Sequence, residues 1–284
     1  MPRLSIILPA KNEAPALTNL LPRLKAAQPD SEIIVVDDGS TDGTAELCAN
    51  CEVICLSSPY SMGNGAAIKR GARAASGDIL VFMDGDGQHD PADIARLLEK
   101  LEHGYDLVVG ARDWSSQAGI GRGVANTLYN WLASRMTGHN VLDLTSGFRA
   151  VRTDKFREFV YLLPNGFSYP TTSTMAFFRS AYPVAYVPIK AAQRVGKSHI
   201  KPLRDGLRFL LIVFKIATLY SPLKLFAPTS ALFFLFGLAN YAWTYFHERR
   251  LTNMSTLMWS AAVIVFLIGL VSEQITALTY RRDD

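Results

Sequence analysis

The sequence predicts an α/β domain built on a mostly parallel sheet, followed by an interfacial helix and a C-terminal pair of membrane helices. Apolar, strand-like segments alternate with amphipathic helical segments up to residue 110, and two long runs without a charge follow near the C-terminus. Repeated β–α units of this length are typical of a mostly parallel sheet with helices on both faces. We expect an α/β domain over residues 1–202, an amphipathic helix over 203–224 and a hairpin over 225–284.

The local pattern of apolar and turn residues predicts each element of the first domain. Strands are expected at 4–9, 32–36, 52–56, 79–83 and 107–110, and helices at 14–27, 44–49, 64–75, 91–103 and 124–137. The regularity ends at a polar, glycine-rich loop over 113–123. A second loop is expected at 167–174, where hydroxyl-bearing residues are frequent.

Two common nucleotide-binding motifs are missing from the sequence. The first strand ends in Pro9-Ala10-Lys11-Asn12-Glu13 rather than in G-x-G-x-x-G, and no G-x-x-x-x-G-K-[ST] occurs. The chain is therefore expected to be neither a dinucleotide-dependent dehydrogenase nor a P-loop NTPase.

The turn after the predicted strand 79–83 carries the most informative polar residues. Asp84, Asp86 and Gln88 follow an apolar run, separated by Gly85 and Gly87. Carboxylate and amide oxygens suit a hard divalent cation, and Mg²⁺ is commonly bound by one or two carboxylates together with substrate phosphates. The alternative is a polar turn with two solvated carboxylates.

Further acidic residues follow the first two strands. Glu13 comes after the first strand, and Asp37 and Asp38 come after the second. Open α/β sheets bind ligands at the carboxyl ends of their strands, so these groups are expected to converge with Asp84 and Asp86. Clustered carboxylates repel one another unless a cation joins them. The Asp38 carboxylate is suited to accept from a base N–H, and that of Glu13 from a ribose hydroxyl.

The C-terminal region predicts a transmembrane hairpin. Residues 226–246 and 254–272 contain no charge, and each run is long enough to cross the roughly 30 Å hydrocarbon core of a bilayer. The alternative is a buried helix pair in a soluble domain. Because no signal-peptide pattern precedes the first strand, the first domain is expected in the cytosol, with the chain in the cell membrane through spans at about 226–246 and 254–273. Glu273 and Gln274 can pair between protomers or lie at the membrane surface.

The segment before the hairpin is basic on one side. If 203–219 is helical, Arg204, Arg208 and Lys215 share one face, and apolar residues occupy the others. This pattern favours a helix in the headgroup layer over an ordinary core-packed helix.

The three cysteines (Cys48, Cys51 and Cys55) have no further Cys or His that completes a zinc site, so buried thiols are expected.

Seven short motifs in order give a family resemblance over about residues 4–205. The chain resembles the inverting family 2 glycosyltransferases of the GT-A fold, and more closely the polyprenyl-phosphate glycosyltransferases such as dolichol-phosphate mannose synthase. The motifs are Pro9-Ala10-Lys11-Asn12-Glu13, Val35-Val36-Asp37-Asp38-Gly39-Ser40, Gly63-Asn64-Gly65-Ala66, Asp84-Gly85-Asp86-Gly87-Gln88-His89, Gly110-Ala111-Arg112, Ser146-Gly147-Phe148-Arg149 and Arg194-Val195-Gly196-Lys197-Ser198. His199 follows Ser198 where the family often has Lys, so Lys197 or Lys201 is expected to replace it.

The resemblance implies a role for each site residue. The implied donor-binding residues are Pro9, Lys11, Glu13, Asp38, Asp84, Gly85, Asp86 and Arg112, and Asp86 and Gln88 would ligate Mg²⁺ or Mn²⁺. The implied acceptor-phosphate residues are Arg122, Ser146, Arg194, Ser198 and Lys201, and Asp84, Asp86 and Arg194 are the implied catalytic residues. Each arginine is otherwise a surface cation or a structural partner of an Asp. His89 is expected to support the site rather than to act as a base.

The implied reaction is inverting transfer of a sugar from a GDP- or UDP-linked donor to a polyprenyl phosphate. The phosphate acceptor is already anionic at pH 7, because its second pKa is about 6, so no general base is needed. Two alternatives stay open: a processive polysaccharide synthase, whose Q-x-x-R-W motif is absent here, and a non-catalytic membrane module that binds nucleotide sugar or lipid. No nucleic-acid partner is expected.

Overall fold

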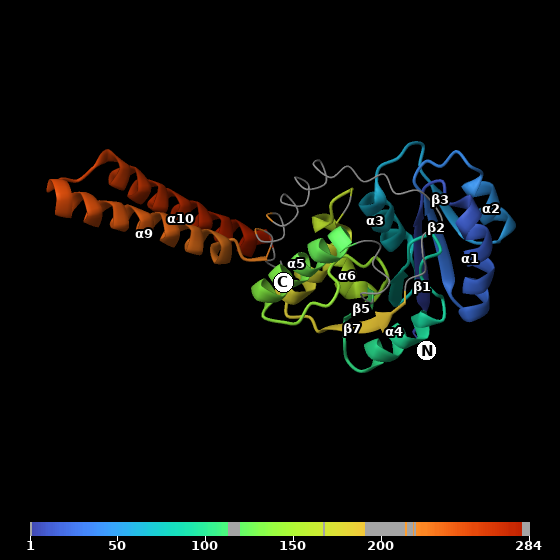
Figure 1. Cartoon of the computed structure of the whole chain (residues 1–284). Coiled ribbons are helices and arrows are strands. Elements are labelled where there is room, and N and C mark those ends of the chain that lie inside the picture. Colours follow the sequence, from blue (N-terminus) through green and yellow to red (C-terminus); the bar gives the residue numbers. More distant parts are fainter. Residues whose placement is uncertain are drawn as a thin grey trace. The chain divides into compact units, whose positions relative to one another are not determined.

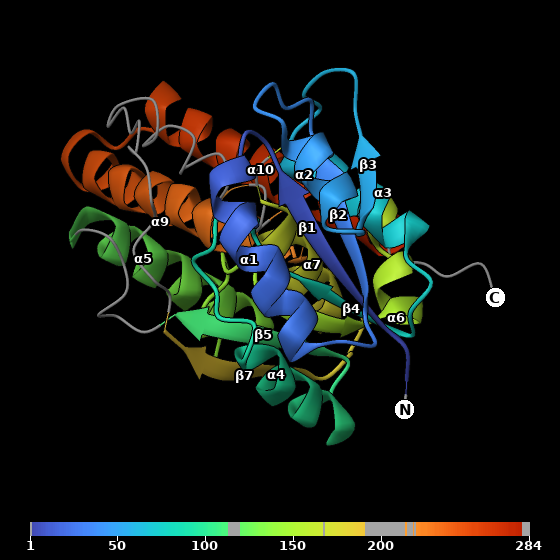
Figure 2. The ribbon, with the colours of Figure 1, turned by 90° about the vertical axis from the view of Figure 1, so that its right-hand side faces the viewer.

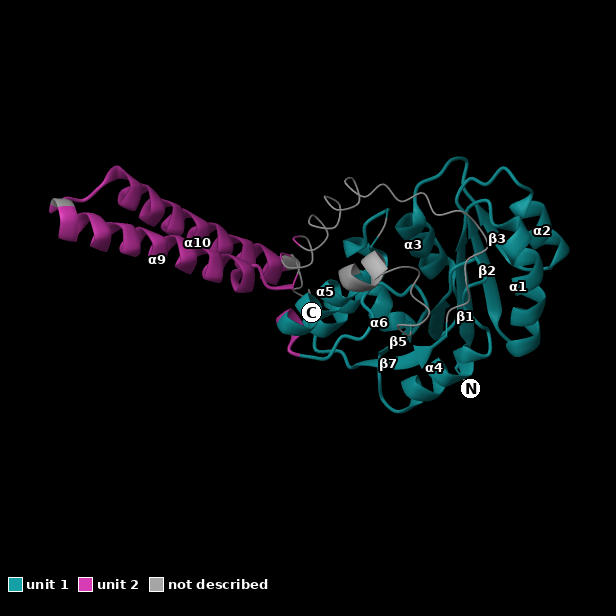
Figure 3. Cartoon of the chain, in the orientation of Figure 1, with its two compact units in different colours: residues 1–135, 139–202 teal, residues 136–138, 203–284 magenta. Residues whose placement is uncertain are grey.

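The computed structural model describes residues 2–112, 120–166, 168–190, 214, 218 and 220–279. The chain divides into two compact units (Figure 3). The first comprises residues 1–135 and 139–202, and the second comprises residues 136–138 and 203–284. The predicted amphipathic helix over 203–224 lies largely outside the described residues, so it stays a prediction.

The first unit contains a seven-stranded sheet in the order β3-β2-β1-β4-β6-β5-β7. Strand β6 is antiparallel to both of its neighbours, and the other pairs are parallel, as the sequence predicts for a mostly parallel sheet. The strands are β1 (Leu4–Ala10), β2 (Glu32–Asp37), β3 (Ile54–Ser57), β4 (Ile79–Phe82), β5 (Leu107–Arg112), β6 (Arg149–Arg152) and β7 (Val184–Ile189).

Helices cover both faces of this sheet (Figures 1 and 2). The helices are α1 (Ala14–Ala27), α2 (Thr44–Asn50), α3 (Asn64–Ala74), α4 (Asp93–Glu102), α5 (Ile120–Thr137), α6 (Thr153–Arg157) and α7 (Tyr169–Arg179). Side chains alternate across a strand, so Ile6 and Leu8 join the core with α1 and α4, whereas Ile7 faces Gly71 of α3. A Cβ at Gly71 would lie 2.5 Å from Ile7, so glycine permits this close helix–sheet contact.

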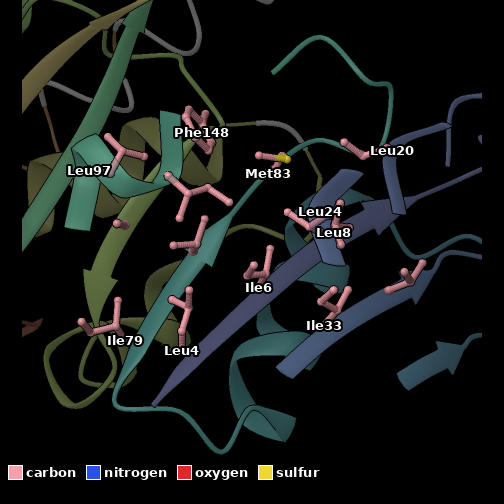
Figure 4. Close-up of a cluster of buried hydrophobic side chains, with 14 of the residues drawn as sticks. Leu4, Ile6, Leu8, Leu20, Leu24, Ile33, Ile79, Met83, Leu97 and Phe148 are labelled. Atoms are coloured by element: carbon pink, nitrogen blue, oxygen red, sulfur yellow. The ribbon is translucent and has the colours of Figure 1, made fainter. Parts of the chain in front are cut away.

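The main core lies between the sheet and helices α1, α2 and α4 (Figure 4). Leucines of α1 recur with helical spacing at 17, 20, 21 and 24, and all four are buried. Cys48 joins this core, and burial together with the neighbouring cysteines raises the pKa of its thiol to about 12. Cys51 and Cys55 are half-buried free thiols.

The structure corrects two expectations in the second half of this unit. Helix α5 begins at Ile120, although residues 120–123 were expected to belong to the polar loop. The segment 167–174, expected to be a loop, contributes the start of helix α7, and residues 169–177 of this helix are all buried. Its hydroxyl groups are compatible with burial because they find internal partners: Ser173 Oγ donates to the carbonyl of Tyr169 at 2.9 Å. Strands β6 and β7, which were not predicted, complete the sheet.

The second unit contains helices α9 (Leu223–Glu248) and α10 (Asn253–Thr279), which form an antiparallel pair. Both are long and apolar enough to cross a membrane, judged by length and composition alone. Gly237 packs against Trp259, and Gly269 packs against Phe226, at distances that leave no room for a Cβ. Glu273 accepts hydrogen bonds from Ser221 Oγ at 3.0 Å and from the backbone N–H of Leu223 at 3.2 Å, so its carboxylate caps the start of α9 within the chain.

Candidate active site

The predicted site residues follow strands whose carboxyl ends lie at one edge of the sheet. Ala10 of β1 pairs with Asp37 of β2, and Ile7 of β1 pairs with Phe82 of β4. The chain therefore leaves β1, β2 and β4 at neighbouring positions, and the loops that follow these strands form one polar edge.

The loops after β1 and β2 are joined by hydrogen bonds. Asn12 Oδ1 accepts from the backbone N–H of Thr41 at 2.8 Å, and the backbone N–H of Asn12 donates to Ser40 Oγ at 2.9 Å. The backbone N–H of Ala14 donates to Asp42 Oδ2 at 2.9 Å. These contacts hold the segment that carries Lys11, which is exposed, and Glu13, which is half-buried.

The carboxylate of Asp38 is buried and fixes the segment 61–63. Its Oδ2 accepts from Ser61 Oγ at 2.6 Å and from the backbone N–H of Gly63 at 2.9 Å, and its Oδ1 accepts from the backbone N–H of Met62 at 2.6 Å. A carboxylate accepts about four hydrogen bonds, so protein donors take most of this capacity. Asp38 positions this loop, and its contact with a nucleobase stays a prediction.

The glycine-rich start of α3 packs against another loop. The backbone N–H groups of Gly65 and Ala66 donate to the carbonyls of Gly166 and Asn165 at 3.2 and 2.9 Å. A Cβ on Gly65 would lie 1.9 Å from the carbonyl oxygen of Pro164. These glycines thus allow two backbones to meet, and the two N–H groups are already occupied by protein carbonyls.

The turn after β4 presents three half-buried oxygen-bearing side chains, those of Asp84, Asp86 and Gln88. The backbone N–H of Gln88 donates to Asp86 Oδ1 at 3.2 Å, and Gly87 has φ of +75°, which closes the turn. Gly85 lies close to the chain after β1, because a Cβ there would be 3.1 Å from the carbonyl oxygen of Pro9. The turn of β4 is thereby placed beside the predicted nucleoside loop.

This turn has the donor chemistry that a hard divalent cation needs. Two carboxylates and an amide oxygen lie within five residues, and their half-buried positions leave them accessible. Within the described part of the chain, no three His, Cys, Asp or Glu side chains form a metal-binding group. The residues therefore fit a cation that is shared with substrate phosphates rather than one enclosed by protein ligands.

His89 supports this turn from the protein interior. Its buried ring stacks on Phe148 with 5.0 Å between centroids, and its Nε2 lies 3.8 Å from Asp84 Oδ2. Gly147 lies on the other side of the carboxylate, where a Cβ would be 2.7 Å from Asp84 Oδ2. Asp84 is therefore held between a buried imidazole and a backbone turn.

Arg112 forms a two-point ion pair with a fully buried partner, Asp143. Its Nε donates to Asp143 Oδ2 at 2.8 Å and its Nη2 to Oδ1 at 3.1 Å, and Nη2 also donates to Thr145 Oγ1 at 2.7 Å. Burial alone would raise the pKa of Asp143, but hydrogen bonds and the charge of Arg112 lower it overall. One edge of the Arg112 guanidinium thus organises the loop 143–146, and its donor-binding role stays a prediction.

The acceptor residues are only partly described. Ser146 is fully buried, and its Oγ has no hydrogen-bond partner among the described residues. Arg194, Ser198 and Lys201 lie outside the described residues, as do Lys197 and His199. Arg122 belongs to α5, but its side chain is likewise not described.

Sequence reasoning missed three residues that organise this region. Asp143 pairs with Arg112, Arg149 is completely buried, and Tyr169 Oη donates to the carbonyl of Gly147 at 3.0 Å. The only available signal was the position of Arg149 in Ser146-Gly147-Phe148-Arg149 directly before a strand-like segment. Charged residues at such positions are buried only when the fold supplies partners.

Residues 5–160 match the family model of glycosyl transferase family 2, and residues 221–278 match that of the GtrB C-terminal hairpin. The chain belongs to glycosyl transferase family 2, and is therefore a glycosyltransferase.

Curated relatives agree with this family. The undecaprenyl-phosphate mannosyltransferase of Micrococcus luteus is 32% identical over 69% of this chain and 86% of its own length. The undecaprenyl-phosphate 4-deoxy-4-formamido-L-arabinose transferase of Proteus mirabilis is 34% identical over 53% of this chain, which spans about half (49%) of that relative's length.

Solved structures agree with the fold. Glucosyl-3-phosphoglycerate synthase of Mycobacterium tuberculosis, in complex with Mn²⁺ and UDP-glucose, superposes with a TM-score of 0.61 at 21% identity, covering 76% of this chain and 78% of that one. Its complex with Mn²⁺, UDP and glucosyl-3-phosphoglycerate gives a TM-score of 0.59 at 24% identity, covering 76% and 78%. At these identities the likeness concerns the fold, and the expected GT-A architecture is confirmed.

Proposed function

We propose that the protein transfers one sugar from a nucleoside-diphosphate sugar to a polyprenyl phosphate at the cytosolic face of the cell membrane. The observation that carries the proposal is the half-buried Asp84–Gln88 turn at the carboxyl edge of a family 2 sheet, in a chain that also has a GtrB-type hairpin. The Micrococcus relative, named for mannosyl transfer to undecaprenyl phosphate, supports the same acceptor class.

The proposed metal ligands are Asp86 and Gln88, with Mg²⁺ or Mn²⁺ as the ion. A divalent ion at this turn would neutralise the donor diphosphate and stabilise it as a leaving group. The proposed nucleoside-binding residues are Pro9, Lys11 and Glu13, which is supported by the close approach of the loop after β1 to the turn. Asp38 would contribute mainly by fixing the segment 61–63 next to them.

The acceptor side of the site needs positive charge rather than a base. A polyprenyl phosphate carries its own nucleophilic oxygen, which is anionic at neutral pH. The chain therefore has to bring two anions to one carbon, and cationic side chains lower that repulsion. We assign this task to Arg122, Arg194 and Lys201, together with the hydroxyls of Ser146 and Ser198.

The hairpin explains how the proposed enzyme reaches its lipid substrate. The phosphate of a polyprenyl lipid stays at the bilayer surface, because its hydrocarbon chain remains in the membrane. Two membrane-spanning helices return both ends of the hairpin to one side of the bilayer, which we assign to the cytosol, and they keep the catalytic unit at that surface. The basic segment over 197–215 would bind lipid headgroups.

The test is a panel of radiolabelled nucleotide sugars with undecaprenyl phosphate and the full chain in detergent. GDP-mannose, UDP-glucose and UDP-N-acetylglucosamine each enter with Mg²⁺ or Mn²⁺, and with EDTA. We expect one donor to label the lipid in a metal-dependent manner with a single sugar. A polymer would instead indicate a processive synthase, and nucleotide-sugar binding without turnover would indicate a binding module.

The stereochemistry of the product provides a second test. In-line attack by the lipid phosphate on an α-linked donor gives a β-linked product, because one displacement inverts the anomeric carbon. The anomeric coupling constant of the purified lipid-phosphate sugar measures the outcome. An α-linked product would contradict the inverting mechanism.

A further inference from the structure

Arg149, at the start of β6, is a buried cation whose direct partners are all neutral. Its side chain is 0% exposed. Within the described part of the chain it forms no ion pair, and each of its hydrogen bonds ends on a carbonyl or hydroxyl oxygen. The acceptors are Pro170 O at 2.9 Å, Ser173 Oγ at 2.8 Å, Thr174 Oγ1 at 3.2 Å and Ser146 O.

Burying a cation in this position lowers the stability of the folded chain unless the charge interacts favourably with another group. Removing an ion from water costs several kcal/mol in a protein interior, and neutral acceptors recover only part of this. An apolar side chain of similar length would fill the same space without that cost. The carboxylates near Arg149 therefore indicate which groups its charge stabilises.

Two carboxylates are close enough to interact with Arg149 through space, those of Asp84 and Asp143. Asp143 is already held at two points by Arg112. Asp84 has no Lys or Arg within ion-pair distance among the described residues, and its side chain is about one-third exposed (35%). The charge of Arg149 thus acts on both carboxylates, and of the two Asp84 is the one without a side-chain ion pair to an Arg or Lys among the described residues.

The same guanidinium also fixes the backbone against which Asp84 rests. Arg149 donates to the carbonyl of Ser146, and Tyr169 Oη donates to the next carbonyl, that of Gly147, at 3.0 Å. The Tyr169 ring lies under the guanidinium, 5.6 Å from its centroid. Gly147 in turn touches the Asp84 carboxylate, where a Cβ would lie 2.7 Å from Oδ2.

We propose that Arg149 is a positioning residue of the transfer site, which sets the place of the Asp84 carboxylate through its buried charge and through the Ser146–Gly147 turn. The inference rests on the proposed function only in taking Asp84 to face the donor. Arg149 is completely buried, and the proposed role does not require it to touch either substrate. It affects the site indirectly, through Asp84 and the Ser146–Gly147 turn.

The experiment compares Arg149→Gln with Arg149→Lys in the full chain. Both variants lose the planar fork, so both are expected to lower the melting temperature by a similar amount, but only Lys keeps the charge. The matched control is Arg157→Gln, because Arg157 also donates to backbone carbonyls, those of Ala72 and Ala75, without contacting the Ser146–Gly147 turn. Transfer rates are expressed per folded molecule, and deuterium uptake of the segment 143–148 is measured without substrate.

Loss of the charge is expected to lower kcat about 100-fold in Arg149→Gln, the size seen when one preorganised electrostatic group is removed. Arg149→Lys is expected to stay within about 10-fold of the wild type, and KM for the donor within about threefold in both. Deuterium uptake over 143–148 is expected to rise in Arg149→Gln and to stay unchanged in Arg157→Gln.

The outcomes separate this inference from the proposed function. Suppose that the wild type transfers sugar and that the Gln and Lys variants have the same kcat, whether this is high or low. The charge of Arg149 then plays no part in transfer, and the inference is overturned. If the wild type transfers none of the sugars tested, the proposed function fails, and deuterium uptake alone decides. Unchanged uptake in Arg149→Gln then overturns the positioning role, and raised uptake supports it.

Discussion

The carboxylates that follow β2 and those that follow β4 lie at the same sheet edge but have different surroundings. After β2, Asp38 and Asp42 are engaged by backbone N–H and hydroxyl donors from neighbouring loops. After β4, Asp84 and Asp86 remain half-buried, and Asp84 rests between a histidine and a glycine turn. Donors from neighbouring loops thus hold the first group in place, while the second lies half-buried in the turn after β4.

This difference separates residues that build the site from residues that meet the substrate. A carboxylate whose lone pairs are occupied by protein donors contributes to stability, and its removal exposes unsatisfied N–H groups. A half-buried carboxylate at the carboxyl edge of the sheet is expected to contribute to ligand binding instead. Substitutions on the two sides should therefore affect different measurements.

The largest effect is expected for Asp86→Ala, which removes a proposed metal ligand. Transfer should fall about 1,000-fold, equivalent to about 4 kcal/mol of transition-state stabilisation, while the free energy of unfolding changes by less than about 1 kcal/mol. Initial rates with radiolabelled donor, together with a denaturant titration, measure both quantities. Full activity in this variant would remove Asp86 from the metal site.

Asp143→Ala should show the largest loss of stability. The variant leaves Arg112 partly buried without its partner, and breaking such a pair costs about 3 kcal/mol of unfolding free energy. Denaturation of the full chain in detergent, followed by circular dichroism, measures this loss. A loss below about 1 kcal/mol would mean that the Arg112–Asp143 pair is not a structural support of the site.

The same pair predicts a pH dependence. The pKa of Asp143 is lower in the folded than in the unfolded chain, so its stabilising contribution is present above the unfolded pKa of about 4 and is lost as the pH falls through the folded value. The wild type should therefore lose more unfolding free energy between pH 5 and pH 3 than Asp143→Asn. Parallel curves for the two proteins would contradict the assignment.

Asp38→Ala should have an intermediate effect on stability. It leaves the N–H groups of Met62 and Gly63 without their acceptor, which should cost about 2 kcal/mol. Because the backbone N–H of Asp38 also donates to the carbonyl of Ala10, in the proposed nucleoside loop, at 2.9 Å, KM for the donor should also rise, with kcat changed less. Asp30→Ala, at an exposed position, is the control for both measurements.

The smallest effect is expected for Asp90→Ala, in the same turn as Asp86. Asp90 pairs with Arg23 at 3.0 Å, but both side chains are more than half exposed, so the pair contributes less than about 0.5 kcal/mol. Unfolding free energy and transfer rate should both stay near the wild-type values. A large loss of activity would show that the turn tolerates no change at all and would weaken the specific role of Asp86.

The sequence was sufficient where periodicity and turn chemistry act locally. The strands that precede Glu13, Asp38 and Asp84, the mostly parallel sheet and the two long apolar helices were all predicted, because each leaves a clear pattern. The start of helix α7, up to residue 174, was predicted as a loop, since its hydroxyl-rich sequence gives no apolar period. Its burial depends on partners such as Arg149 that are distant in sequence.

The partners of the buried charged side chains could not be predicted either, because they too are distant in sequence. Arg112 and Asp143 are separated by 31 residues, and Arg149 and Ser173 by 24. No spacing rule links such pairs, so Arg112 was predicted as a donor-binding residue, with a surface cation or a structural partner of an Asp as alternatives, and no particular Asp was assigned to it. Buried charge networks depend on tertiary packing, which a single sequence does not encode in a local pattern.

The most direct test of the central claim is mass spectrometry of the lipid after incubation with the full chain in liposomes that contain undecaprenyl phosphate. We predict that, with the correct nucleotide sugar and a divalent ion, the lipid gains the mass of one sugar residue, and that EDTA prevents the gain. An unchanged lipid with every donor, or a donor cleaved to free sugar instead, would contradict the account.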